Sequence, residues 1–223
     1  MEDIRLSLSI DADQRVSALA TVPDRPRAVF VFAHGAGAGM AHAFMAGVAA
    51  GLAGRGIATL RYQFAYMERG SKRPDPPRLA HAAVRAAVAE AVQRWPGLPL
   101  VAGGKSFGGR MTSQAQAEAP MHGVAALAFI GFPLHPAGKP ATDRADHLAR
   151  VHVPMLFVQG TRDELAGLDL LRPVVARLGK RARLHLVDDA DHAFHVRARS
   201  GRNDAAALAE LIDALAAFVA APA

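Results

Sequence analysis

The sequence predicts an α/β fold, in which a mostly parallel, twisted sheet is flanked by helices. Three observations predict it. Short apolar runs typical of strands buried on both faces recur along the chain. Segments with helical periodicity alternate with them, as right-handed strand–helix–strand crossovers require. The connections are short and contain no low-complexity linker or internal repeat, so we expect residues 1–223 to form one domain.

The first half of the chain begins with an expected hairpin, because residues 4–10 and 16–22 both alternate as strands do. The continuous apolar run 28–33 predicts a buried strand. A helix with apolar residues at 44, 48 and 52 follows, and Gly54 to Gly56 ends it. A strand over 57–62 comes next, and then an amphipathic helix over 84–95 that ends at Pro96-Gly97.

The second half repeats this alternation. The expected strands are 98–103, 124–130, 153–159 and 182–187. The expected helices contain residues 111–115, 172–178 and 208–219, and the last has the most regular apolar stripe. Residues 133–150 leave little room for a lid between two strands, so we expect an open site with a minimal lid or none.

Composition excludes several classes of protein. Hydrophobic residues make up 51% of the chain and charged residues 21%, which argues against disorder, and the absence of cysteine excludes disulfides and a thiolate nucleophile. The apolar stretch 123–134 is shorter than the roughly 20 residues that span a bilayer. The start of the chain, Met1-Glu2-Asp3-Ile4, is acidic and shows no leader, so we expect a cytoplasmic protein with no membrane contact. Despite the net charge of +6, no basic stripe contains interleaved aromatic residues, so we expect no nucleic-acid partner.

A candidate nucleophile follows the strand expected at 98–103. Gly104-Lys105-Ser106-Phe107-Gly108 is a complete Gly-x-Ser-x-Gly motif between a strand and a helix. A serine exposed on such a sharp turn occupies a strained backbone conformation, and side chains two residues away on either side would collide there. Gly104 and Gly108 remove those collisions, so the motif predicts a nucleophile elbow with Ser106 at its tip.

A serine nucleophile needs a base and a group that orients the base. Asp163 follows the strand expected at 153–159, and His192 follows the strand at 182–187. Because the carboxyl ends of parallel strands meet at one edge of a sheet, we expect both side chains near Ser106. Glu164, Asp143 and Asp146 remain alternatives for the acid, and His195 for the base.

Backbone N–H groups must also stabilise the negative charge that develops on a substrate oxygen. The glycine-rich segment 34–39 follows the strand at 28–33, so we assign the oxyanion hole to the N–H groups of Ala36 and Phe107. We interpret His34 as an organiser of this loop. The acidic residues Asp188, Asp189 and Asp191 suggest a metal site, but we favour a solvated turn. The His192-x-x-His195 spacing suits zinc, but no third ligand with suitable spacing is present. We therefore expect no metal and no cofactor.

With these residues identified, the chain resembles the α/β-hydrolase superfamily over essentially its whole length. It is most similar to the small dienelactone-hydrolase-like branch, which also contains a subunit of a chromatin-modifying complex. The order Ser106, Asp163, His192 is that of the superfamily. The matching segments are 34–38, 66–69, 103–110, 160–163 and 190–194. Dienelactone hydrolases proper carry a cysteine nucleophile, which this chain lacks, so their substrate is not implied.

The resemblance implies a serine hydrolase with a Ser106–His192–Asp163 triad. We expect a carboxylic ester or thioester hydrolase that forms an acyl-enzyme with small acyl substrates, while amidase, peptidase and acyltransferase activities stay open. The alternative is a non-catalytic interaction module on the same fold. The sequence leaves open whether the protein is a monomer or a homodimer.

Two further interpretations concern basic residues. Arg69, Lys72 and Arg73 follow the strand at 57–62, where they would favour acyl groups with a second carboxylate if they overhung the site. A solvated surface is the interpretation we favour. Gly104-Lys105-Ser106 resembles part of a phosphate-binding loop, but Pro99 stands where that motif requires its first glycine, so we do not expect nucleotide binding.

Overall fold

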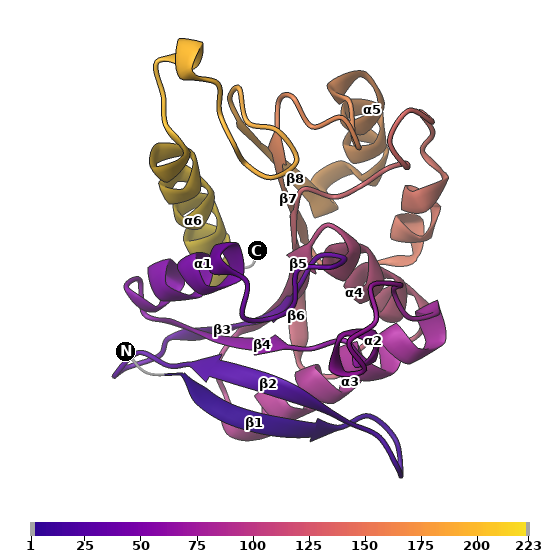
Figure 1. Ribbon diagram of the computed structural model, residues 1–223, viewed down its shortest axis with the longest axis vertical. Coiled ribbons are helices and arrows are strands. Elements are labelled where there is room, and N and C mark those ends of the chain that lie inside the picture. The colour runs from indigo at the N-terminus through magenta and orange to yellow at the C-terminus, as the bar shows by residue number, and fades with distance from the viewer. Residues whose placement is uncertain (1–2, 222–223) are drawn as a thin grey trace.

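The computed structural model describes residues 3–221, in which eight strands form one sheet in the order β1-β2-β4-β3-β5-β6-β7-β8. β1 pairs antiparallel with β2, and β2 with β4, while all other neighbours are parallel (Figure 1). The strands are β1 (Ile4–Ser9), β2 (Arg15–Thr21), β3 (Ala28–Ala33), β4 (Ile57–Tyr62), β5 (Leu100–Lys105), β6 (Val124–Ile130), β7 (Met155–Gly160) and β8 (Ala182–Val187). The predicted mostly parallel α/β architecture is confirmed.

Helices cover both faces of the sheet, and each face has its own apolar core. The helices are α1 (Ala43–Ala53), α2 (Ala65–Glu68), α3 (Pro77–Arg94), α4 (Phe107–Glu118), α5 (Leu168–Leu178) and α6 (Asp204–Ala220), with short 3-10 helices η1 (Asp143–Arg150), η2 (Gly179–Arg181) and η3 (Ala198–Ser200). Helices α1 and α6 pack together on one face, whereas α3, α4 and α5 contribute to the core of the other (Figure 1). The central strands are therefore buried on both sides.

Most expected elements are present, with differences at their ends. β5 begins and ends two residues later than predicted, so that Lys105 belongs to the strand and Ser106 follows it directly. α3 begins at Pro77, because proline suits the first position of a helix, where its missing N–H has no partner to lose. α5 begins at Leu168 and accommodates Pro173 within it, so the predicted start at residue 172 is wrong.

The connection between β6 and β7 runs over residues 131–154, and η1 is its one helical segment in the described chain. η1 packs against α4, beside the sheet. The short insertion agrees with the expected minimal lid. Leu134 and Leu148 are fully buried, so this connection extends the core.

The centre of the sheet tolerates no side chain at Gly103. A Cβ atom added there would lie 1.8 Å from the carbonyl oxygen of Ala128 in the neighbouring strand β6. Such a contact involves backbone atoms that cannot rotate away. Gly47 in α1 offers a contrast, because an added Cβ would meet Leu208 Cδ2 at an ordinary 3.6 Å.

These two glycines give a matched pair of predictions. We expect Gly103→Ala to lower the free energy of unfolding by more than about 3 kcal/mol, because β5 and β6 must separate. We expect Gly47→Ala to raise it by roughly 0.5–1 kcal/mol, since alanine costs less backbone entropy in a helix. Urea unfolding followed by circular dichroism measures both. Equal stability of the two variants would contradict this account of the sheet.

Candidate active site

Three side chains from separate strand ends meet at the carboxyl edge of the sheet. Ser106 follows β5, Asp163 follows β7 and His192 follows β8. His192 Nε2 lies 2.9 Å from Ser106 Oγ, and His192 Nδ1 lies 2.7 Å from Asp163 Oδ2. Both distances are those of hydrogen bonds. The structure therefore joins the three predicted residues into one continuous chain of contacts.

The turn that carries Ser106 is strained and tightly enclosed. Ser106 has φ 49° and ψ −113°, a backbone conformation that residues other than glycine rarely adopt. A Cβ atom at Gly104 or Gly108 would lie 2.6 Å from the carbonyl oxygen of Ala33 at the end of β3. The Ser106 N–H donates to the Ile130 carbonyl of β6. Both glycines are thus required by the close approach of this turn to β3, as the motif predicts.

Asp163 is buried, and three hydrogen-bonding groups contact its carboxylate. Its side chain has no exposed area, and Gln159 Nε2 donates to the same Oδ2 atom that faces His192, at 2.5 Å. The Leu165 N–H donates to Oδ1 at 2.9 Å. Because an ionised carboxylate accepts without donating, His192 must carry its proton on Nδ1. The Nε2 lone pair then faces the Ser106 hydroxyl.

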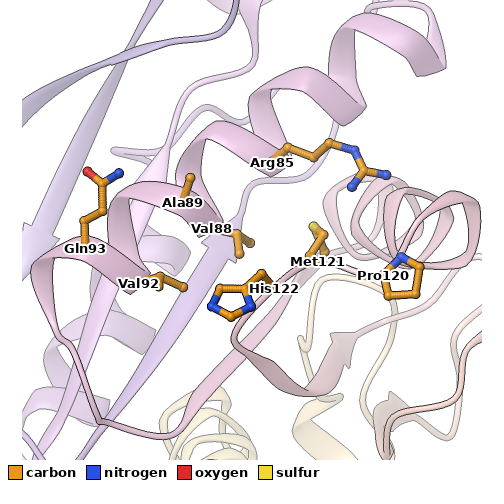
Figure 2. Close-up of a pocket in the computed structure, with 8 residues that line it drawn as sticks. All are labelled: Arg85, Val88, Ala89, Val92, Gln93, Pro120, Met121 and His122. Atoms are coloured by element: carbon orange, nitrogen blue, oxygen red, sulfur yellow. The ribbon is translucent and has the colours of Figure 1, made fainter.

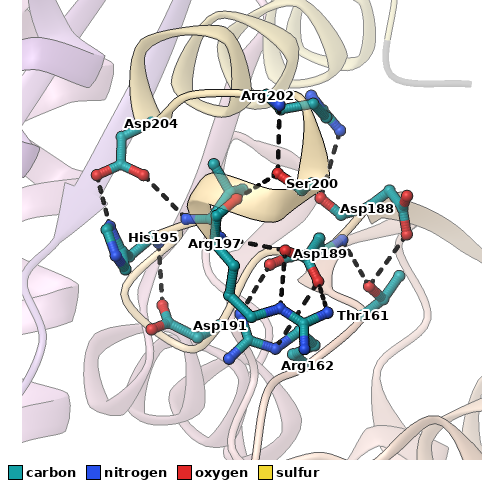
Figure 3. A network of polar contacts seen from close by, with 11 residues as sticks. Thr161, Arg162, Asp188, Asp189, Asp191, His195, Arg197, Ser200, Arg202 and Asp204 are labelled. Carbon is teal, nitrogen blue, oxygen red and sulfur yellow. Dashed lines mark hydrogen bonds and ion pairs between the residues drawn. The ribbon is translucent and has the colours of Figure 1, made fainter.

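The loop that carries His192 is fixed by its own acidic residues (Figure 3). Asp191 Oδ1 accepts the N–H groups of Ala193 and His195, which closes a tight turn around His192. Asp189 is buried and pairs with Arg197, so the interpretation of this segment as a solvated turn is wrong for Asp189. These polar side chains thus fix the conformation of the loop.

β7 approaches the His192 loop closely. A Cβ atom at Gly160 would lie 2.3 Å from the carbonyl oxygen of Ala190. The Arg162 N–H donates to that same carbonyl. This contact holds the segment that carries Asp163 against the segment that carries His192.

The two predicted oxyanion donors border the serine. An added Cβ at Gly35, next to Ala36, would lie 3.9 Å from Ser106 Cβ, and Phe107 opens helix α4 directly after Ser106. Within the described residues, neither the Ala36 nor the Phe107 N–H has a protein acceptor. The next N–H along, that of Gly37, donates to the Tyr66 hydroxyl at 3.1 Å and is therefore occupied. In the described part of the chain, both N–H groups are therefore left without a protein partner.

His34 organises the loop that carries Ala36, as its position predicts. Its ring is buried, with Nδ1 2.8 Å from the Gly35 carbonyl, while Nε2 accepts the Phe64 N–H at 3.1 Å. Burial lowers the pKa of His34 to about 4, so the ring is neutral at pH 7. A neutral ring donates at Nδ1 and accepts at Nε2, which matches both contacts.

The alternative residues lie elsewhere. His195 is exposed and pairs with Asp204 at the start of α6, with Nδ1 and Oδ2 2.6 Å apart (Figure 3). Glu164 is exposed, whereas Asp163 contacts the imidazole. Arg69 pairs with the buried Asp75 at 2.7 Å, so its charge is already partnered. Lys72 and Arg73 are exposed and have no contact in the structure with the three site residues.

Two residues that contact the site were not predicted. Gln159 is fully buried in β7 and bridges Asp163 to the Phe132 N–H, and Lys105 Nζ donates to the His192 carbonyl. An amide inside an apolar strand, four residues before the predicted acid, is the signal that identifies Gln159. Lys105 has no such signal, because the variable position of a Gly-x-Ser-x-Gly motif does not reveal where its side chain points.

Other features lie apart from this site. A cavity of about 310 Å³ lies between α3 and residues 120–122, which precede β6 at the opposite edge of the sheet (Figure 2). Among residues 3–221, no group of three or more histidine, aspartate or glutamate side chains is arranged to hold a metal ion. No helix in this part of the chain is long and apolar enough to cross a membrane.

Comparison with known proteins adds a family. A family model described as "Alpha/beta hydrolase domain" matches residues 26–220. An esterase domain from Rhodothermus marinus is 18% identical with a TM-score of 0.71, covering 99% of this chain and 100% of that one. A dienelactone hydrolase from Anabaena variabilis is 20% identical with a TM-score of 0.75, covering 97% and 96%. A serine hydrolase without a lid from Xanthomonas campestris is 20% identical with a TM-score of 0.74, covering 98% and 95%.

The buried histidines predict how stability depends on pH. Burial lowers the pKa values of His34 and His147 to about 4, against an ordinary value of 6.5. Between these values the unfolded chain binds protons that the folded chain does not, so the free energy of unfolding should fall as the pH is lowered from about 6.5 towards 4. Urea unfolding at several pH values measures this slope.

Variants identify the source of that slope. His34→Gln and His147→Gln should each make it shallower, because each removes one buried titrating group. His152→Gln should leave it unchanged, because His152 is exposed. A slope that is the same in all four proteins would contradict the assignment.

Proposed function

The chain belongs to the alpha/beta hydrolase family, and from that premise we propose that it is a serine hydrolase that cleaves carboxylic esters or thioesters of small acyl groups. The proposal assigns Ser106 as the nucleophile, His192 as the general base and Asp163 as the residue that orients the base. The observation that carries it is the unbroken hydrogen-bond chain from Ser106 Oγ through the imidazole to the buried Asp163 carboxylate.

In the first half of the reaction, Ser106 Oγ attacks the acyl carbon while His192 Nε2 takes the hydroxyl proton. The resulting imidazolium lies beside the Asp163 carboxylate, which stabilises its charge without taking the proton. The C–O or C–S bond of the tetrahedral intermediate then breaks. His192 returns the proton to the departing alkoxide or thiolate, and an acyl group remains on Ser106.

In the second half, water replaces the alcohol or thiol. His192 removes a proton from the water as the water oxygen attacks the acyl carbon. The second tetrahedral intermediate collapses, and the bond between the acyl carbon and Ser106 Oγ breaks. The proton returns from His192 to Ser106, and the carboxylic acid leaves.

The negatively charged oxygen of each intermediate is bound by the Ala36 and Phe107 N–H groups in this proposal. Neither group has an acceptor among residues 3–221, and the Phe107 N–H lies in the first turn of α4, where the helix dipole favours negative charge. Removing one such donor from a comparable site costs about 3–4 kcal/mol of transition-state stabilisation. The unpaired N–H groups of Ala36 and Phe107 therefore favour a catalytic role in acyl transfer over a non-catalytic binding role.

The substrate class follows from the architecture around the serine. The β6–β7 connection adds η1 beside α4, and the described chain contributes no separate lid domain. An open site has little surface with which to enclose a substrate. A small, reactive ester or thioester needs less stabilisation from the site to react than an amide does, so esters and thioesters suit it better. Arg69 is already paired with Asp75, so we do not propose that Arg69 selects acyl groups with a second carboxylate.

Kinetics on a small activated ester tests the proposal. We expect Ser106→Ala to lower kcat/KM for p-nitrophenyl acetate by about 10⁴-fold or more, because no nucleophile remains in contact with His192. Steady-state release of p-nitrophenolate measures it. Retention of turnover in Ser106→Ala would contradict the proposal, and a folded wild type without turnover on ester or thioester panels would favour a non-catalytic interaction module.

A second serine–histidine pair supplies the control. Ser113 Oγ lies 2.7 Å from His147 Nε2, but Ser113 is fully buried and donates its proton to the Arg110 carbonyl. We expect Ser113→Ala to keep kcat/KM within about 3-fold of the wild type, because a serine without an accessible hydroxyl or an orienting carboxylate is not an activated nucleophile.

A further inference from the structure

We propose that Lys105 is a positioning residue that ties the His192 loop to strand β5 and keeps the imidazole aligned with Ser106, and that it does so as an ammonium. This inference rests on the proposed serine hydrolase function. It assigns a role to the residue next to the nucleophile, whose side chain is partly buried against the His192 loop.

The contact that carries the proposal is direct. Lys105 Nζ donates to the backbone carbonyl of His192, with the two atoms 2.5 Å apart. Lys105 and Ser106 are consecutive, so the end of β5 holds the nucleophile through its backbone and the base through this side chain. One short segment thereby fixes the distance between the two groups that must exchange a proton. Because displacement of about 1 Å in such a geometry can cost 10²-fold in rate, this link matters.

Two aromatic rings and a glycine surround the Lys105 ammonium. Lys105 Nζ lies 5.4 Å from the centre of the Phe194 ring and 6.0 Å from that of Phe44, and the two rings stack on each other. Both distances fall in the range of cation–π contacts. A Cβ atom at Gly131 would lie 2.9 Å from Lys105 Nζ and 3.4 Å from His192 Nδ1, so the absence of a side chain there admits both groups.

Other contacts hold other parts of the His192 loop, and one of them, from the Arg162 N–H after β7 to the Ala190 carbonyl, was described above. Asp189 pairs with Arg197, and Asp204 holds His195 and the Val196 N–H at the start of α6 (Figure 3). These contacts fasten the loop to its own ends and to α6. Lys105 is a contact from the sheet itself to the His192 backbone, and it comes from the strand that bears the nucleophile.

Charge explains why a lysine suits this position. The titratable groups that face the ammonium are Asp163, Asp191 and His192, and the two carboxylates attract it. Burial opposes them and lowers the pKa of Lys105 to about 8. At pH 7 the side chain therefore keeps its proton, whereas above pH 8 it becomes a neutral amine, which is a weaker donor and no longer attracts Asp163.

The loss of the Lys105 proton has opposite effects on activity and on stability, so the two roles can be distinguished. Between pH 8 and the ordinary lysine value of 10.5, the unfolded chain binds a proton that folded Lys105 has lost. The contribution of this group to the free energy of unfolding therefore rises with pH. A fall in kcat through about pH 8 is then not a consequence of unfolding caused by Lys105.

The test compares Lys105→Met, Lys105→Gln and wild type on p-nitrophenyl acetate. Methionine keeps an unbranched side chain one atom shorter than that of lysine and removes donor and charge, while glutamine keeps an N–H donor without charge. At pH 7 we expect kcat to fall about 10- to 100-fold in Lys105→Met with KM within about 3-fold, and to be intermediate in Lys105→Gln. Lys139→Met, at an exposed lysine after β6, should match the wild type.

The pH profile of kcat is the second readout. We expect wild-type kcat to decline as the pH rises through about 8 and the Lys105→Met profile to lack this decline. A flat wild-type profile from pH 7 to 9, or a Lys105→Met variant within about 2-fold of the wild type, would overturn the inference. A wild type that turns over no ester would instead count against the proposed function, so the two failures are distinct.

Discussion

The site depends on one steric constraint, which is how closely the turn after β5 passes its neighbouring strands. Added side-chain atoms at Gly103, Gly104 or Gly108 would lie within 2.6 Å of backbone oxygens in β6 and β3. Three glycines therefore let the backbone enter a space that other residues could not. Ser106 takes a positive φ at the tip of this turn, directly before helix α4.

The base and the acid are then held against that fixed serine from several directions. Gln159 and the Leu165 N–H orient the Asp163 carboxylate, which in turn sets the proton on His192 Nδ1. The acidic residues of the His192 loop close it from outside, and Lys105 contacts it from the sheet. Polar groups that look unrelated in the sequence thus serve one purpose, which is to limit the movement of a single imidazole.

The sequence predicts the strands, the elbow and the three side chains that meet, because each depends on local patterns. Apolar runs mark the strands, and Gly104 and Gly108 flank Ser106 at fixed spacing. Side-chain contacts made within and between loops have no such signature. The pairing of Arg69 with Asp75, the burial of Asp189 and the reach of Lys105 to His192 depend on how the loops fold back on one another. The roles of the assembled residues remain predictions.

The central claim is that Ser106 is an activated nucleophile, and intact-mass analysis after treatment with a fluorophosphonate probe tests it most directly. The probe phosphonylates a serine whose proton an adjacent base removes, and it needs no knowledge of the substrate. We expect one adduct on the wild type and none on Ser106→Ala, with both proteins folded. An unlabelled, folded wild type, or equal labelling of the two proteins, would contradict it.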